Sequence, residues 1–170
     1  MKKFELTTEF ITNFLGTKLF RIKALVEFGE VEKGELGGFV EKEENLDHNG
    51  DAWVSGDAWV YGDAWVSGDA RVYGDARVYG DARVSGNAEV SGNQMYATVK
   101  GFGSEYRNTT FFITKDGNVC VNCGCFSGTL EQFREKVEET HKDTKYAKEY
   151  LMIADLMEMH FKEELEKIKK

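Results

Sequence analysis

The sequence predicts a mainly β protein, in which a parallel β-helix of hexapeptide repeats lies between an amino-terminal β cap and a small carboxy-terminal α+β domain. Three observations predict this fold. One six-residue phrase repeats without a change of register from Gly50 to Gly92, short extended segments precede it, and the period changes at Met95. Self-similarity at a fixed short period is typical of a solenoid. The expected segments are residues 1–35, 36–93 and 94–170.

The repeated phrase is Gly-Asp-Ala-(Trp/Arg)-Val-(Ser/Tyr), which has room for one short strand and one tight turn. Side chains alternate along a strand, so each valine and the alanine before it point inward, where aliphatic groups gain most from burial. Glycine tolerates positive φ and aspartate accepts hydrogen bonds from its own turn, so the Gly-Asp pairs form the corners. Three corners close a coil of about eighteen residues, and the repeats build about three coils.

A coil of this length also predicts the outward neighbours, which are Trp53 beneath Arg71, Trp59 beneath Arg77 and Trp65 beneath Arg83. Adjacent strands lie about 4.8 Å apart, which is close enough for a guanidinium to cover an indole. Such columns stabilise the stacking of coils, and they also offer a binding surface. The expected contact residues are Trp59, Tyr61, Arg77 and Tyr79 on the most aromatic face, together with Trp53 and Arg71.

The segment before the repeats contains extended stretches such as Leu19–Val26. A β-helix exposes unpaired strand edges at its ends, so we expect residues 1–35 to form the amino-terminal cap. Leu36–Val40 and Leu46 are interpreted as degenerate hexads that begin the β-helix.

Beyond Met95 the pattern predicts a β-hairpin and two helices. Thr110–Thr114 and Val119–Cys123 are strand-like and are joined by a good hairpin turn. Thr129 has capping-box spacing for a first helix. A second, longer helix from about Thr144 is apolar over much of its circumference, so we expect it to pack on more than one neighbour and to contact another subunit.

Composition restricts the function classes. The net charge is −8 and no basic cluster occurs, so nucleic acid is not an expected partner. The amino terminus becomes polar at once, and no apolar run is long enough to span a membrane. The three cysteines form no disulfide framework. We therefore expect a protein of the bacterial cytoplasm, with no membrane partner and no cofactor.

His48 is the one histidine near the repeats. Hexapeptide β-helices include many acyltransferases, in which a histidine deprotonates the acceptor. The repeats contain no loop insertion that would build a substrate pocket. A surface turn residue is therefore the favoured interpretation, and His48 is catalytic only if the protein is an acyltransferase.

Three cysteines are close together at Cys120, Cys123 and Cys125, and His141 offers a fourth zinc ligand. The chain lacks the second closely spaced pair of a usual zinc site, and Cys120 and Cys123 point to opposite faces of a strand. We expect no metal and interpret these cysteines as small buried residues. Two weaker alternatives are a Cys125–His141 nucleophile pair and calcium at stacked aspartates such as Asp51 and Asp69.

Several stretches of the chain resemble known proteins. Those resembling the opening of YdcK-like hexapeptide-repeat proteins are Phe20–Leu25, Phe28–Val31, Gly37–Glu41, Asn45–Leu46 and Gly50–Val54. Those similar to the carboxy-terminal domains of phage and prophage proteins with the same repeat are Gly124–Leu130, Glu139–His141 and Lys148–Tyr150. The resemblance implies a left-handed β-helix, the trimeric assembly common in hexapeptide proteins, and a phage or mobile-element origin. It implies no activity and no catalytic residue.

The expected function is therefore non-enzymatic binding by a homo-oligomer, most simply a trimer. The protein would be a phage or prophage accessory factor that inhibits or sequesters a host defence component. One alternative is a CoA-dependent acyltransferase. The other is a sponge for a nucleotide signal, which would have to gather Arg71, Arg77, Arg83 or Arg107 at a subunit junction. An acidic oligomer suits a basic protein better than an anionic nucleotide.

Overall fold

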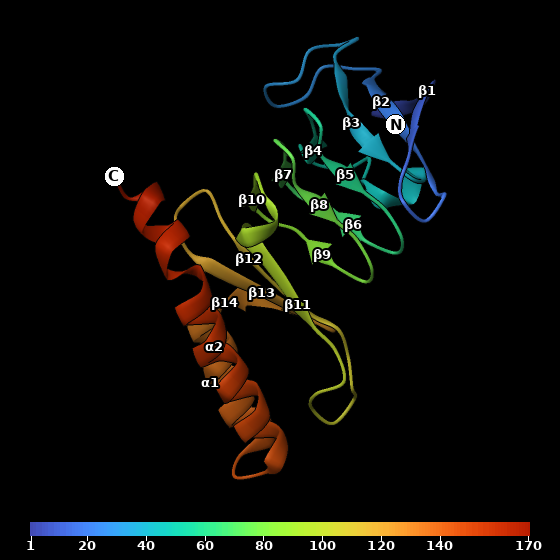
Figure 1. Cartoon of the computed structure of the whole chain (residues 1–170). Helices are drawn as coiled ribbons and strands as arrows, with labels where there is room; N and C mark the ends of the chain where they lie inside the picture. Colours follow the sequence, from blue (N-terminus) through green and yellow to red (C-terminus); the bar gives the residue numbers. More distant parts are fainter. The chain divides into compact units, whose positions relative to one another are not determined.

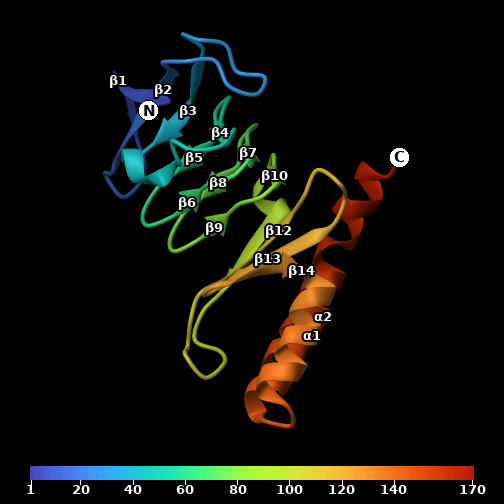
Figure 2. The same cartoon turned by 180° about the vertical axis from the view of Figure 1, so that it is seen from behind.

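The computed structural model describes residues 1–170, which form two compact units, Met1–Asn93 and Gln94–Lys170. We call them the repeat unit and the carboxy-terminal unit. The first holds the stacked short strands and the second holds both helices (Figures 1 and 2).

The repeat unit begins with three longer strands and continues with strands of two residues. The longer strands are β1 (Phe4–Thr12), β2 (Lys18–Ala24) and β3 (Leu36–Val40), and a 3-10 turn, η1 (Glu43–Asn45), follows them. The short strands are β4 (Trp53–Val54), β5 (Trp59–Val60), β6 (Trp65–Val66), β7 (Arg71–Val72), β8 (Arg77–Val78), β9 (Arg83–Val84) and β10 (Glu89–Val90). A second 3-10 turn, η2 (Asn93–Met95), ends the repeats.

The predicted spacing of eighteen residues is confirmed by parallel strand pairing. Trp53 pairs with Arg71, Trp59 with Arg77, and Trp65 with Arg83. Val54, Val72 and Val90 are paired in one column, and all three are fully buried. The repeat glycines from Gly50 to Gly86 have φ between 63° and 70°, the left-handed region that glycine enters without steric cost. The periodicity therefore determines both the interior and the corners.

The degenerate hexads pair with a different spacing. Phe39 pairs in parallel with Trp59, and Leu46 bridges Val66, so the offset is two residues longer than in the repeats. The spacing from Val40 to Leu46 equals that from Val60 to Val66, so the two additional residues lie after Leu46, in the turn at residues 47–52 before β4. β3 also pairs antiparallel with β2, and the result is one five-stranded sheet in the order β1-β2-β3-β5-β8.

The amino-terminal segment satisfies carbonyl groups that the repeats leave unpaired. Within the repeats, many strand N–H groups donate to a carbonyl one coil later, for example Trp53 N to Ala70 O. The carbonyls of the first repeat coil therefore need other donors, because buried backbone groups are almost always paired. The Asn45 amide donates to Gly62 O and Ala64 O, and Lys3 Nζ donates to Gly50 O and Ala52 O.

The carboxy-terminal unit is a four-stranded antiparallel sheet with two helices. The strands follow one another in space as in sequence, and they are β11 (Tyr96–Val99), β12 (Thr109–Ile113), β13 (Val119–Cys123) and β14 (Phe126–Thr129). The helices α1 (Leu130–His141) and α2 (Lys145–Ile168) run side by side. The predicted capping box is confirmed, because Thr129 accepts from Gln132 N and the Gln132 side chain accepts from Thr129 N. Neither helix combines the length and the apolar character that crossing a membrane requires.

Candidate functional site

The aromatic face predicted from the repeats is part of a longer row on the five-stranded sheet. Register places Arg21, Phe39, Trp59 and Arg77 on successive strands, and we call this row the outer ladder. The Arg21 guanidinium lies 4.4 Å from the Phe39 ring centroid, and Arg77 lies 4.2 Å from that of Trp59. Beside the ladder, Tyr61 and Tyr79 stack at 5.3 Å with their ring planes 13° apart.

The ladder combines fixed side chains with exposed ones. Arg21 is held by Glu9 at 3.0 Å and donates to Gly37 O at 2.7 Å. Burial and the neighbouring Tyr79 raise the pKa of Tyr61, so its hydroxyl is neutral at physiological pH. Tyr79 remains 52% exposed and Arg77 is also exposed. This face therefore presents ordered aromatic and guanidinium groups, which are the groups enriched at protein interfaces.

Trp53 was predicted to be a contact residue on an outer face, and this prediction is wrong. The side chain is 2% exposed and packs edge-on against Phe28 at 5.4 Å and Phe4 at 6.5 Å. The amino-terminal segment covers this column, so the indole belongs to the core. Arg71, which is paired with Trp53, is partly exposed. The third column is as expected, since Arg83 lies 5.7 Å from the Trp65 ring.

His48 is tied into the amino-terminal cap. Its ring stacks on Phe4 at 4.4 Å, and Nδ1 accepts a hydrogen bond from Lys3 N at 3.2 Å. Nε2 lies 3.6 Å from a carboxylate oxygen of Glu43. Both nitrogens are therefore engaged in structural contacts, and neither is presented to a substrate as a general base.

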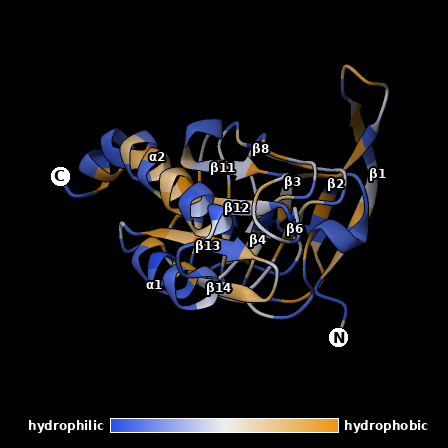
Figure 3. Cartoon of the chain, turned by 90° about the horizontal axis from the view of Figure 1, so that it is seen from below, coloured by the Kyte–Doolittle hydropathy of each residue, from blue (hydrophilic) through white to orange (hydrophobic).

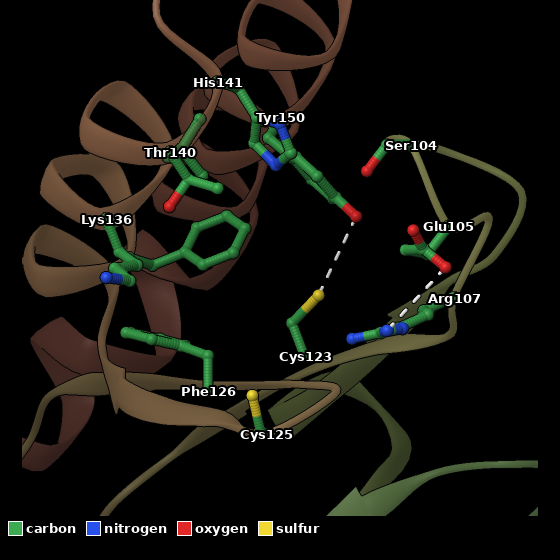
Figure 4. A pocket seen from close by; sticks show the side chains of 12 residues that line it. Ser104, Glu105, Arg107, Cys123, Cys125, Phe126, Lys136, Thr140, His141 and Tyr150 are labelled. Carbon is green, nitrogen blue, oxygen red and sulfur yellow. Dashed lines mark hydrogen bonds and ion pairs between the residues drawn. The ribbon is translucent and has the colours of Figure 1, made fainter.

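A pocket of about 240 Å³ lies within the carboxy-terminal unit, between β13, β14, α1 and the 104–107 loop (Figure 4). Three aromatic rings form its floor. Phe133 contacts Phe126 at 5.6 Å and Tyr150 at 5.5 Å. The polar groups around them include Arg107, Lys136 and His141, and Glu105 lies 3.8 Å from Arg107.

Tyr150 is fixed at the inner side of this pocket. Its hydroxyl donates to Phe102 O at 3.3 Å and accepts from the Cys123 thiol at 3.8 Å. Thr109 Oγ1 in turn donates to Cys123 Sγ at 3.2 Å. Burial raises the pKa of Tyr150 to about 12, with the Cys123 thiol adding to the effect. The phenol is therefore neutral and adds no negative charge beside the basic groups of the pocket rim.

The three cysteines were interpreted as small buried residues, and this interpretation is wrong. Cys125 is exposed and Cys123 is half-buried, and both line the pocket, whereas Cys120 lies outside it, half-buried on β13. Figure 4 shows Cys125 and His141 on opposite walls of the pocket, and no hydrogen bond joins them. No group of three His, Cys, Asp or Glu side chains is gathered to hold a metal ion anywhere in the chain. Burial raises the pKa of the Cys120 thiol above its usual value, so the free group is a thiol at neutral pH.

Parallel pairing at a fixed offset defines the repeat unit as a β-solenoid. The model of the YdcK β-solenoid repeat family matches it in three overlapping copies, over residues 64–80, 70–86 and 76–92. The resemblance to YdcK-like repeat proteins is thus confirmed for this part of the chain. No curated protein shows significant similarity to the sequence.

Several site residues were missed at the sequence level. The ladder continues to Arg21 and Phe39, whose antiparallel pairing has no periodic signal. The pocket joins residues from separate segments, and of its three basic rim residues Lys136 was not singled out. The capping box at Thr129 gave the start of α1, but only the packed structure brings that helix beside Tyr150.

Proposed function

We propose that this protein is a non-enzymatic, self-associating binding protein of phage or prophage origin. It acts in the bacterial cytoplasm by stoichiometric capture of a host component, a protein of the host's defence. The β-solenoid is left-handed, has about three coils, and provides a rigid frame for the contact surface. The observation that carries this proposal is the outer ladder with its adjacent Tyr61–Tyr79 stack, which is ordered and partly exposed.

The charge of the chain supports a protein partner. At −8, the surface attracts a basic protein and repels an anionic ligand, and complementary charge accelerates association. The arrangement around His48 supports binding over acyl transfer, since both ring nitrogens face neighbouring groups of the cap.

Affinity capture from an infected or defence-carrying host tests this function. The wild type and a Tyr61→Glu/Tyr79→Glu variant are compared, with Tyr73→Glu as the matched control on another outer column. We expect one basic host protein, recovered in constant ratio with the wild type and the control and lost with the double variant. Copurified acyl-CoA, or acyl transfer that disappears in His48→Ala, would overturn the binding function in favour of the acyltransferase.

Self-association through the ladder face is the second part of the proposal. Clustered exposed aromatic residues mark contact surfaces, and cyclic symmetry is the common way to close them. A trimer is the expected assembly, by analogy with hexapeptide-repeat proteins. Light scattering should give a lower molar mass for Tyr61→Glu/Tyr79→Glu than for the wild type, and an unchanged mass for Tyr73→Glu. An unchanged mass in the double variant would remove the ladder face from the interface.

A second candidate function follows from the pocket. Its aromatic floor suits a planar base, and the rim groups Arg107, Lys136 and His141 suit a phosphate, which are the two parts of a nucleotide. The phosphate would compete with Glu105 for Arg107 and with Glu139 for Lys136. This function is the nucleotide sponge considered above, with Arg107 binding the nucleotide inside one chain and not at a junction between subunits. Isothermal titration with ADP is the test, and Arg107→Glu should abolish binding whereas Lys115→Glu, outside the pocket, should not. Absence of heat with the wild type would exclude adenine nucleotides.

A further inference from the structure

One face of α2 is both apolar and exposed. Met152, Leu156 and Met159 follow one another at helical spacing and expose 72%, 50% and 67% of their surface, and we call them the α2 stripe. The opposite face of the helix packs against α1 and β12 through Ala147, Tyr150, Ile153, Ala154, Met157 and Phe161. Figure 3 shows the hydrophobic and hydrophilic residues that alternate along α2. The folding of the carboxy-terminal unit therefore leaves the α2 stripe uncovered.

Charged residues extend the stripe at both ends, with opposite sign. At about 100° per residue, Lys145 and Lys148 lie on the same face before Met152, and Glu163 and Glu166 lie on it after Met159. All four are exposed. Lys148 and both glutamates form no ion pair within the chain, and Lys145 contacts only Glu149, at 3.4 Å. These charges are therefore available to a partner.

The pattern is symmetric about the peptide bond that joins Asp155 and Leu156. A second copy of α2 running antiparallel would face each residue with its mirror position. The resulting pairs are Lys145 with Glu166, Lys148 with Glu163, and Met152 with Met159. A parallel copy would instead place lysines against lysines, and like charges at such positions repel. Leu156 has Asp155 as its mirror position, and Asp155 is held by Arg134 of its own chain at 2.9 Å. The flanking charges and Met152 with Met159 are thus complementary in the antiparallel direction, and the charges are not complementary in the parallel one.

We propose that α2 of one copy packs antiparallel on α2 of a second copy, about a two-fold axis next to Leu156. The helix is about 36 Å long, so the contact extends over about six turns. Burial of the stripe drives association, and the flanking charges fix the direction, as they do in coiled coils. This pairing rests on the proposed self-association and specifies a second contact, distinct from the ladder face.

Charge exchange tests the pairing. One variant, Lys145→Glu/Lys148→Glu, has an entirely acidic face, and the other, Glu163→Lys/Glu166→Lys, has an entirely basic one. Each repels its own copy, whereas an equimolar mixture restores all four pairs, as does the combined fourfold exchange within one chain. Light scattering over a dilution series gives the molar mass, and circular dichroism confirms that each exposed substitution leaves the fold intact. Glu135→Lys/Glu138→Lys on α1 controls for the change in net charge.

Because a two-fold contact doubles the assembly that the ladder face forms, we expect each twofold variant to have half the molar mass of the wild type. The mixture and the fourfold exchange should recover the mass fully. An unchanged mass in both variants would overturn the pairing, and so would a loss that the mixture does not reverse. The ladder variant separates the two contacts. If Tyr61→Glu/Tyr79→Glu lowers the mass while the charge variants do not, only the α2 pairing is wrong. A reduction seen only in the charge variants leaves the pairing intact and removes the ladder contact.

Discussion

The two units of this protein form their cores in different ways. In the repeat unit every valine from Val54 to Val90 is fully buried, and its neighbour is the equivalent valine of the next coil. In the carboxy-terminal unit, the buried rings of Phe111, Phe133 and Phe161 come from a strand and two helices with no common period. Stability is therefore a sum of nearest-neighbour contacts in the first unit and a shared property of one core in the second.

The same contrast holds for their surfaces. The repeat unit carries an outer ladder built by stacking equivalent positions, such as Trp59 and Arg77. The carboxy-terminal unit carries a pocket and the α2 stripe, which depend on packing between different elements. The repeated sequence thus places like side chains in rows, whereas the surfaces of the carboxy-terminal unit combine residues from unrelated segments.

The largest expected effect is on the shared core. Phe161 is fully buried on α2, and Phe161→Ala should lower the free energy of unfolding by about 3–5 kcal/mol, because it removes a large apolar contact and leaves a cavity. Chemical denaturation followed by helical circular dichroism measures this. The adjacent exposed Lys162→Ala should change stability by less than about 0.5 kcal/mol. Equal effects of the two would mean that α2 does not close the core.

The next effect concerns the first coil of the repeat unit. Asn45 is fully buried and donates to Gly62 O and Ala64 O, so Asn45→Ala leaves two carbonyls without their donor. The expected loss is about 2 kcal/mol. All three tryptophans lie in the repeats, so the urea midpoint of tryptophan fluorescence reports on this unit. Asn49→Ala, in an exposed turn, is the control. A midpoint equal to that of the wild type would show that these carbonyls find other donors.

Equivalent glycines offer a finer test of the repeat. Gly50 and Gly80 both have φ of +68°, so alanine at either position costs about 1 kcal/mol for the backbone conformation. A Cβ at Gly50 would also lie 2.5 Å from Gly68 O, whereas a Cβ at Gly80 meets no atom within 4 Å. Gly50→Ala should therefore be less stable than Gly80→Ala by about 1 kcal/mol or more. The reverse order would contradict the stacking of these corners.

The smallest effect is a pH dependence. Burial lowers the pKa of Lys3 from 10.5 to about 8, partly offset by Asp47 and Asp51. Between these two values the unfolded chain binds the additional proton, so stability increases with pH over this window. Over this window the free energy of unfolding should increase by about 1 kcal/mol relative to a Lys3→Met variant, which cannot titrate at this position. Urea unfolding from pH 7.5 to 10.5 measures it, and a decrease with pH would contradict the burial of this amine.

The sequence predicted what depends on periodicity. The stacking partners of Trp59 and Trp65, the interior valine column and the capping box at Thr129 follow from spacing alone, and each is found. The boundaries of the segments and the handedness of the solenoid stay predictions. Where one residue type recurs at a fixed interval, knowing the stacking partner of one residue predicts the stacking partners of the equivalent residues in the other repeats.

What escaped prediction depends on contacts between unrelated segments. Trp53 has the same local sequence as Trp65, yet it is buried because Phe4 and Phe28 cover it. The longer first coil requires two extra residues between Leu46 and Trp53, which no repeat encodes. The pocket likewise needs Arg107 from a loop and Tyr150 from α2. In each case the determining contact joins residues that are far apart in the sequence and do not recur at a fixed interval.

The central claim is that both units present surfaces on which copies of this chain meet. Multi-angle light scattering of the wild-type protein over a dilution series tests it most directly. The account predicts a molar mass of two or more 19.3-kDa chains that decreases on dilution. A mass of one 19.3-kDa chain at every concentration would contradict it.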